Sequence, residues 1–130
     1  MTGLKPSTRY YYIVGDASAG FSSPNWFISG KAGDDTSGFS IAVFGDVGVF
    51  NSEHSIAMLN NATLRGEVDW LWHVGDISYA DDAFLHYPFH FMYESVYNEY
   101  MNAVQPMASR TAYMVLPGNH EAECHSLPCF

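Results

Sequence analysis

Residues 68–79 read VDWLWHVGDISY, and this stretch decides the fold. Its first seven residues are mostly apolar or aromatic, which predicts a buried strand over Val68 to Val74. The strand runs directly into Gly75 and Asp76, so that the glycine allows a sharp turn and the aspartate places a polar group at the strand end. A strand that ends in this way is a typical unit of an α/β sheet, and the chain contains two more.

The two other segments lie on either side of this stretch in the sequence. Phe39 to Phe44 is a short apolar strand that runs into Gly45-Asp46. Tyr113 to Leu116 is a strand that runs into residues 117–120, which read PGNH. All three predicted strands therefore end in a glycine followed by a polar side chain.

Helices are predicted between these strands. The first, over Glu53 to about Arg65, begins after the potential cap Ser52 and stops at Gly66. The second runs from about Phe89 to Ala108. Apolar residues that recur at helical spacing predict a core-facing side for each helix: Ile56, Leu59 and Leu64 in the first, and Phe89, Met92, Tyr93, Val96, Tyr97, Tyr100, Met101 and Val104 in the second.

The order strand, helix, strand, helix, strand predicts parallel pairing with right-handed crossovers. All three strand ends then lie at one edge of the sheet, which is where open α/β sheets bind ligands. We expect the oxygen-bearing side chains of Asp46, Asp76, Tyr79 and Asn119 to meet there. Two metal ions about 3.5–4 Å apart need a carboxylate between them, and Asp76, on the middle strand in sequence order, is the natural bridge.

Each of these residues also has a common structural role. A Gly-Asp pair after a strand is usually a turn or a helix cap, a lone tyrosine usually packs, and a lone asparagine usually turns the chain. Only the occurrence of all three polar strand ends in one chain favours a metal site over these alternatives.

The first 33 residues have a different character. Thr8 to Val14 and Asn25 to Ser29 are strand candidates, and residues 33–38, which read GDDTSG, resemble a linker. An isolated hairpin is only marginally stable. We therefore expect residues 1–33 to be the end of a β-domain and residues 34–130 to be a separate α/β unit.

Composition excludes several classes of protein. The chain of 130 residues is 48% hydrophobic and 16% aromatic, which argues against intrinsic disorder. Its formal net charge of −9 argues against nucleic acid or an anionic membrane as a partner. No apolar run approaches the ~18 residues of a membrane span, and no hydrophobic signal-peptide region follows Met1.

Three motifs resemble those of the purple acid phosphatases, a branch of the calcineurin-like metallophosphoesterases. They are G-D-x-G at Gly45–Gly48, G-D-x-x-Y at Gly75–Tyr79 and G-N-H-E at Gly118–Glu121. Tyr79 identifies the branch, because most of the superfamily instead has Asp-x-His at the first motif, where this chain has Gly48.

The resemblance implies the first half of a metallophosphoesterase β-α-β-α-β sandwich. Residues 4–12, which read LKPSTRYYY, resemble the closing strands of a fibronectin-like domain. Residues 1–33 would then be the C-terminal end of that domain, and residues 34–130 the N-terminal half of the catalytic domain. The family's V-x-x-H and G-H-x-H motifs, which supply three histidine ligands, are not in this sequence. We therefore expect a partial chain that is inactive alone; a non-catalytic truncated product or a partner-dependent fragment is the alternative.

The same resemblance implies a role for each site residue. Asp46 and Tyr79 would bind Fe(III), Asp76 would bridge the two metals, and Asn119 would bind a divalent ion, which in this family is zinc, iron or manganese. His120 would contact the phosphate or protonate the leaving group. The implied reaction is hydrolysis of a small phosphate monoester at acidic pH; a diester or a nucleotide remains open as the substrate.

A few residues outside these motifs carry further expectations. Glu121 is expected to orient its neighbour, and His73, inside a strand, to be a core residue. Asn61 begins a glycosylation sequon, and Cys124 and Cys129 form either a local disulfide or two free thiols. The resemblance implies a secreted, lysosomal or vacuolar location, and a homodimer is one option for the full-length protein.

Overall fold

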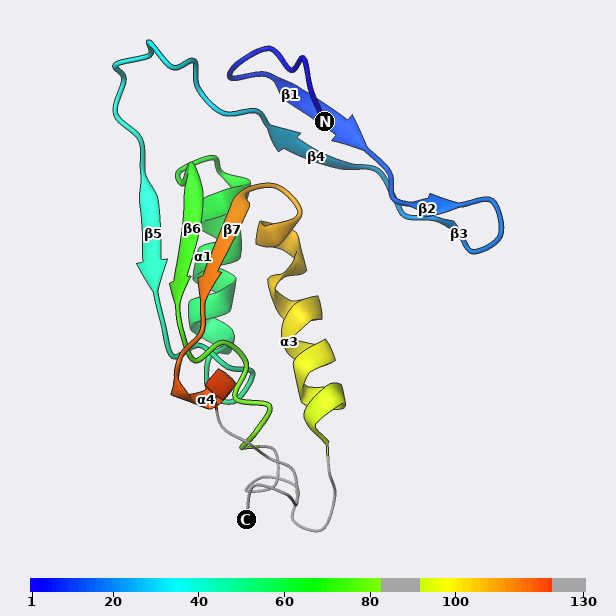
Figure 1. Ribbon diagram of the computed structural model, residues 1–130, viewed down its shortest axis with the longest axis vertical. Helices are drawn as coiled ribbons and strands as arrows, with labels where there is room; N and C mark the ends of the chain where they lie inside the picture. Colours follow the sequence, from blue (N-terminus) through cyan, green and yellow to red (C-terminus); the bar gives the residue numbers. More distant parts are fainter. Residues whose placement is uncertain (83–91, 123–130) are drawn as a thin grey trace.

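The computed structural model describes residues 1–82 and 92–122, which form an N-terminal antiparallel hairpin followed by an α/β unit (Figure 1). The elements are β1 (Arg9–Tyr12), β2 (Gly15–Asp16), β3 (Gly20–Phe21), β4 (Asn25–Ile28), β5 (Ile41–Phe44), α1 (Glu53–Leu64), β6 (Trp70–Val74), α3 (Tyr93–Ala108), β7 (Ala112–Leu116) and α4 (Asn119–Ala122).

Strands β5, β6 and β7 form a parallel sheet in that order. Leu71 at the centre pairs with Ala42 on one side and with Tyr113 on the other. This confirms the predicted α/β class and places the three strand ends at one edge of the sheet (Figure 1). Because β6 is the central strand, the loop that contains Asp76 lies between the other two strand ends.

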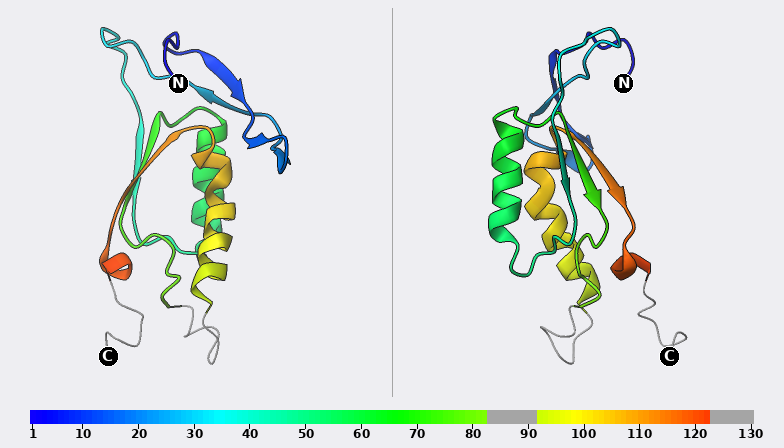
Figure 2. Two further views of the ribbon diagram at one scale, coloured as in Figure 1. Left: turned by 45° about the vertical axis from the view of Figure 1, so that its right-hand side comes forward. Right: turned by 90° about the vertical axis from the view of Figure 1, so that its left-hand side faces the viewer.

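Helices α1 and α3 pack side by side on one face of the sheet (Figure 2). The core beneath them contains the buried side chains of Ile56, Leu71, Tyr100, Val104 and Met107. On the opposite face, the side chains of alternate strand residues are exposed: Val43, Trp70, Trp72, Val74 and Met114. Residues 68–74 were predicted to form a buried strand; in β6 Leu71 and His73 are fully buried, whereas the alternate residues face away from the helices and are exposed.

The buried side of α3 is narrower than its apolar pattern suggested. Tyr97 and Met101, predicted to face the core, are 37% and 46% exposed, whereas Met107, which was not predicted, is fully buried. Leu64 at the end of α1 is also exposed. Helix α3 begins at Tyr93, and the predicted start of this helix at Phe89 lies outside the described residues.

The N-terminal hairpin packs near the opposite end of the sheet from the polar strand ends (Figure 1). Strands β1 and β4 pair antiparallel, as do the short strands β2 and β3, which were not predicted. The Tyr12 hydroxyl donates a hydrogen bond of 2.6 Å to the carbonyl of Ser109, and the guanidinium of Arg110 stacks on Trp26. Assignment of this hairpin to a fibronectin-like domain stays a prediction.

None of the helices within residues 1–82 and 92–122 has the length and apolar character needed to cross a membrane.

Candidate metal centre

The backbone after two of the strands adopts an unusual conformation. Only five described non-glycine residues have positive φ, and three of these are Asp46 (56°), Asp76 (51°) and Tyr79 (52°). A left-handed conformation costs a side-chain-bearing residue roughly 1 kcal/mol or more, and such residues cluster at functional sites. All three residues lie in the loops that follow β5 and β6, and this clustering points to a functional site.

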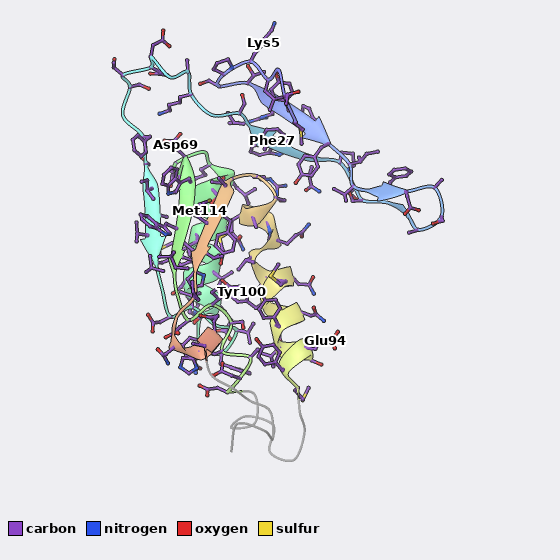
Figure 3. All side chains as sticks on the ribbon, in the orientation of Figure 1. Lys5, Phe27, Asp69, Glu94, Tyr100 and Met114 are labelled. Atoms are coloured by element: carbon purple, nitrogen blue, oxygen red, sulfur yellow. The ribbon has the colours of Figure 1, made fainter. Side chains whose placement is uncertain are left out.

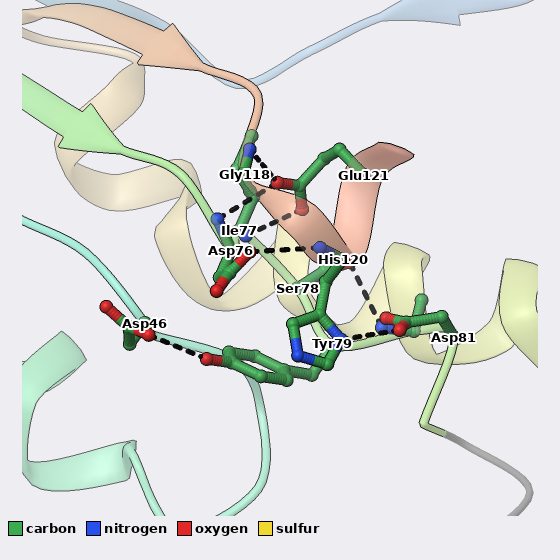
Figure 4. A network of polar contacts seen from close by, with 10 residues as sticks. Asp46, Asp76, Ile77, Ser78, Tyr79, Asp81, Gly118, His120 and Glu121 are labelled. Carbon is green, nitrogen blue, oxygen red and sulfur yellow. Dashed lines mark hydrogen bonds and ion pairs between the residues drawn. The ribbon is translucent and has the colours of Figure 1, made fainter. Parts of the chain in front are cut away.

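The first two strand ends contact each other through Tyr79 and Asp46. The Tyr79 hydroxyl donates a hydrogen bond of 3.0 Å to Oδ1 of Asp46 (Figure 4). The Asp46 amide also donates one of 3.2 Å to the carbonyl of Gly75. Gly48 allows this close approach, because a Cβ atom there would lie 2.9 Å from the carbonyl oxygen of Ser78 and 3.0 Å from Cδ2 of Tyr79. The glycine of the G-D-x-G motif therefore makes room for the tyrosine of the second motif.

Burial raises the pKa of Tyr79 well above its ordinary value, and the hydrogen bond to Asp46 and the nearby carboxylate charges raise it further. The phenol therefore keeps its proton at neutral and acidic pH. A bound cation reverses this effect, because a positive charge beside the oxygen favours the phenolate.

Glu121 joins the second and third strand ends. Its carboxylate accepts hydrogen bonds from the amides of Asp76 (2.9 Å), Ile77 (2.8 Å) and Gly118 (2.7 Å) (Figure 4). Burial alone would raise the pKa of Glu121, but these backbone donors outweigh it and lower the pKa. Glu121 was expected to orient its neighbour; the contacts show that its carboxylate holds the backbone on both sides of the site.

The Asp76 side chain is directed toward the third strand end. Its Oδ1 accepts a hydrogen bond of 3.1 Å from the His120 amide (Figure 4). Gly118 leaves the space for this carboxylate, since an added Cβ atom would collide with Oδ1 of Asp76. Asn119, the first residue of α4, is exposed beside these groups.

His120 is held by a residue that the sequence patterns did not indicate. Its Nδ1 lies 2.5 Å from Oδ2 of Asp81, which is only 7% exposed, and its ring lies 4.3 Å from that of Tyr79, centroid to centroid. The bond to Asp81 raises the pKa of His120. The feature of the sequence that could have indicated this partner is the carboxylate of Asp81, two residues after the G-D-x-x-Y motif.

Two sets of potential ligands follow from this geometry. Asp46, Asp76 and Tyr79 offer hard oxygen atoms at adjacent strand ends, and the 3.0 Å contact between the Tyr79 hydroxyl and Asp46 is a place where a cation can replace the phenolic proton. Asp81, Asp82 and His120 form a second group, with one potential ligand atom from each within 4.8 Å of the others. The first set fits a hard cation, because carboxylate and phenolate oxygens are hard ligands.

The other predicted residues lie away from the centre or outside the described part of the chain. His73 is fully buried, which confirms its prediction as a core residue. Asn61 lies on α1 with its side chain exposed, whereas Thr63 of the same sequon is buried and donates a hydrogen bond to the carbonyl of Leu59. Cys124 and Cys129 lie outside the described residues.

Comparison with known proteins agrees with the geometry. The family of calcineurin-like phosphoesterases matches residues 39–130. Acid phosphatase A of Cryphonectria parasitica is 29% identical over 98% of this chain and 30% of its own length. Acid phosphatase type 7 of Mus musculus is 34% identical over 91% of the chain and 24% of its own. A probable inactive purple acid phosphatase 9 of Arabidopsis thaliana is 29% identical over 98% of the chain and 20% of its own.

A solved structure shares the fold. The purple acid phosphatase isolated from yellow lupin (Lupinus luteus) seeds superposes with a TM-score of 0.72 at 21% identity, over 91% of this chain and 22% of that one. The chain thus spans less than a third of the length of these relatives. The family match and the three polar strand ends lead to one conclusion: the chain belongs to the calcineurin-like phosphoesterases, and its relatives include purple acid phosphatases.

Proposed function

We propose that this chain supplies part of the active site of an acid phosphatase that hydrolyses phosphate monoesters at a centre of two metal ions. The observation that carries the proposal is the contact between Tyr79 and Asp46, with Asp76 held beside them at the central strand end. A phenol and two carboxylates at one sheet edge, in strained backbone conformations, form an oxygen-rich site for hard cations.

In this proposal Asp46 and Tyr79 would hold Fe(III), Asp76 would contribute to both metal sites, and Asn119 would hold a divalent ion such as zinc, iron or manganese. When bound, the metal pair supplies Lewis-acid chemistry that polarises the phosphate ester and acidifies water. Three histidines supplied by the V-x-x-H and G-H-x-H motifs of the family would complete the ligand set.

The remaining steps belong to His120 and its partners. With a raised pKa and an anionic partner at Nδ1, His120 is protonated at acidic pH and can donate a proton from Nε2 to the leaving-group oxygen. Asp81 fixes the ring in this orientation, and the ring of Tyr79 packs against it. Glu121 holds the backbone amides around Asp76 and takes no part in proton transfer.

Export from the cytosol, glycosylation at Asn61 and a homodimeric full-length protein belong to the same proposal. The alternative, a non-catalytic product, is supported by the relative described as probably inactive. It is not favoured, because Asp46, Asp76, Tyr79 and Asn119 are all present in this chain.

The test is hydrolysis of p-nitrophenyl phosphate and bis(p-nitrophenyl) phosphate at pH 5 to 7. The protein assayed is this chain extended by a segment that carries the V-x-x-H and G-H-x-H motifs, with folding verified by circular dichroism. We expect monoester hydrolysis that Asp76→Asn reduces at least a hundredfold, whereas Asp34→Asn, in the linker, leaves it unchanged. A folded, metal-loaded protein that hydrolyses neither ester would overturn the proposal.

A further inference from the structure

A cleft lies between the N-terminal hairpin and the turn from α3 to β7, at the end of the sheet away from the polar strand ends (Figure 1). Its volume is about 620 Å³, which lies within the range of small-molecule sites in proteins. Residues 27–31 of the hairpin and residues 108–112 of the turn both line it. We call it the hairpin cleft.

Much of the wall of the hairpin cleft is apolar. Leu4, Pro6 and Phe27 line it from the N-terminal part, and Ala108 and Ala112 line it from α3 and β7. Figure 3 shows Phe27 on the side of the hairpin that faces the α/β unit. A wall of this kind favours a ligand with an aromatic or alkyl body over a bare inorganic ion.

The charged residues of the hairpin cleft are all basic. None of its described lining residues is acidic, although the chain has 14 acidic residues and only 5 basic ones. The side chain of Lys5 extends away from the fold (Figure 3). The Lys31 ammonium lies 3.5 Å from Oδ2 of Asp69, which balances its charge. Arg110 is therefore the cation that remains for a ligand.

Arg110 has a hydrogen-bond donor that the protein does not use. Its Nη1 donates hydrogen bonds of 2.8 Å to the Pro106 carbonyl and 2.9 Å to the Ser109 hydroxyl. Its Nε, in contrast, is buried and has no hydrogen-bond partner among the described residues. A buried donor without an acceptor is unfavourable, and an acceptor brought by a ligand would satisfy it.

A second arginine adds positive charge beside Arg110. The guanidinium carbons of Arg9 and Arg110 lie 4.3 Å and 5.2 Å from the centre of the Trp26 ring. Cation–π contact thus holds both charges next to one indole. Within residues 1–82 and 92–122, neither arginine forms an ion pair with a carboxylate. Two unpaired guanidinium groups at one ring create a positive potential that attracts an anion.

We propose that the hairpin cleft binds a small amphipathic carboxylate, that is, an organic acid with an aromatic or alkyl body. The carboxylate accepts hydrogen bonds from Arg110, because a planar guanidinium matches the two oxygens of a carboxylate. The body of the ligand packs against Phe27 and Ala108. Bound in this way, the ligand contacts both the hairpin and the α/β unit and stabilises their association. The inference does not rest on the proposed function, because the metal centre lies at the other end of the sheet.

The test is a ¹H–¹⁵N NMR titration of the chain with 4-phenylbutyrate at pH 6. We expect saturable shifts at the amides of residues 29–30 and 109–111 and at the Nε–H of Arg110. Neutral 4-phenylbutyramide, which has the body without the charge, and inorganic phosphate, which has charge without the body, should each bind at least tenfold more weakly. Equal binding of the amide would show adsorption to an apolar surface, and equal binding of phosphate a simple anion site. Either result would overturn the proposal.

Two variants test the two halves of the site. Arg110→Gln removes the guanidinium, and Ala108→Leu fills part of the cleft while it leaves Arg110 in place; each should weaken binding of 4-phenylbutyrate at least tenfold. Arg65→Gln, an exposed arginine outside the cleft, is the control and should bind like the unmodified chain. Undiminished binding by a folded Arg110→Gln variant would overturn the proposal, as would shifts confined to Trp70 and Trp72 on the exposed sheet face. If Arg110→Gln does not fold, Ala108→Leu and the Nε–H signal of the unmodified chain decide.

Discussion

Tyr79 and Asp46 come from loops that follow two adjacent parallel strands, and the Tyr79 hydroxyl donates a hydrogen bond of 3.0 Å to Oδ1 of Asp46. The pair joins the first two of the three polar strand ends. Because burial and the carboxylate raise the pKa of the phenol, it gives up its proton only when a cation takes the place of that proton.

This relationship predicts a colour change on iron binding. Titration of the chain with Fe(III) should give a visible absorption band from phenolate-to-iron charge transfer, and Tyr79→Phe should remove the band. Tyr97→Phe, which alters an exposed tyrosine of α3 outside the strand-end loops, should retain it. A band of equal intensity in the Tyr79→Phe variant would show that another tyrosine binds the iron.

Replacement of Glu121 by glutamine should destabilise the chain. The change removes an anionic acceptor shared by three backbone amides, and a hydrogen bond to a charged group contributes about 1.5–3 kcal/mol. Urea denaturation at pH 7 should show a loss in this range. Glu67→Gln, which breaks an exposed ion pair with Arg65, should cost much less; similar losses in the two variants would contradict the role of Glu121.

The same glutamate gives a predicted pH dependence. Since the folded-state pKa of Glu121 is lowered, its contribution is fully present above the unfolded-state pKa of about 4.3 and is lost as the pH falls through the lowered folded value. The stability difference between the unmodified chain and Glu121→Gln should therefore be constant from pH 7 to 5 and shrink below about pH 4. A difference that persists unchanged at pH 2 would contradict this.

His120 should titrate above an ordinary histidine, and the cause should be Asp81. Its raised pKa means that the His120–Asp81 pair stabilises the fold fully below about pH 6.5 and loses this effect as the pH rises through the folded value. In NMR titrations of the metal-free chain, Asp81→Asn should lower the pKa of His120. Asp34→Asn, in the linker, should leave the pKa of His120 unchanged. Equal His120 pKa values in the unmodified chain and in both variants would exclude Asp81 as the cause.

Gly48→Ala should disturb the site more than an ordinary glycine substitution. The new methyl group would press on the Ser78 carbonyl and the Tyr79 ring, so these groups must move. We expect lower stability and a weaker iron band than in Gly30→Ala, where an added Cβ meets nothing within 4 Å. Equal behaviour of the two variants would mean that the loop after β5 relaxes without moving Tyr79.

The sequence predicted the parallel sheet and the common edge of its strand ends well, because strand periodicity and Gly-Asp turns are local signals. It did not predict that Asp81 holds His120, since this contact depends on the path of a loop rather than on residue spacing. The positive φ of Asp46 and Asp76 was also not foreseen, because aspartate adopts that conformation only when its surroundings impose it.

The core-facing side of α3 was predicted too broadly for a related reason. Tyr97 and Met101 have the helical spacing of the buried residues, yet they lie at the border of the contact with the sheet and are partly exposed. Apolar spacing identifies a face of a helix, but how far that face is covered depends on the elements packed against it.

The most direct test of the central claim is paramagnetic broadening of amide NMR signals by Mn²⁺ added to the chain at low stoichiometry. If the strand ends form the metal centre, broadening should be strongest at Asp46, Asp76, Tyr79 and Asn119, and Asp76→Asn should abolish it. Broadening centred on Asp81 and Asp82, or spread over the acidic surface and unaffected by Asp76→Asn, would contradict the assignment.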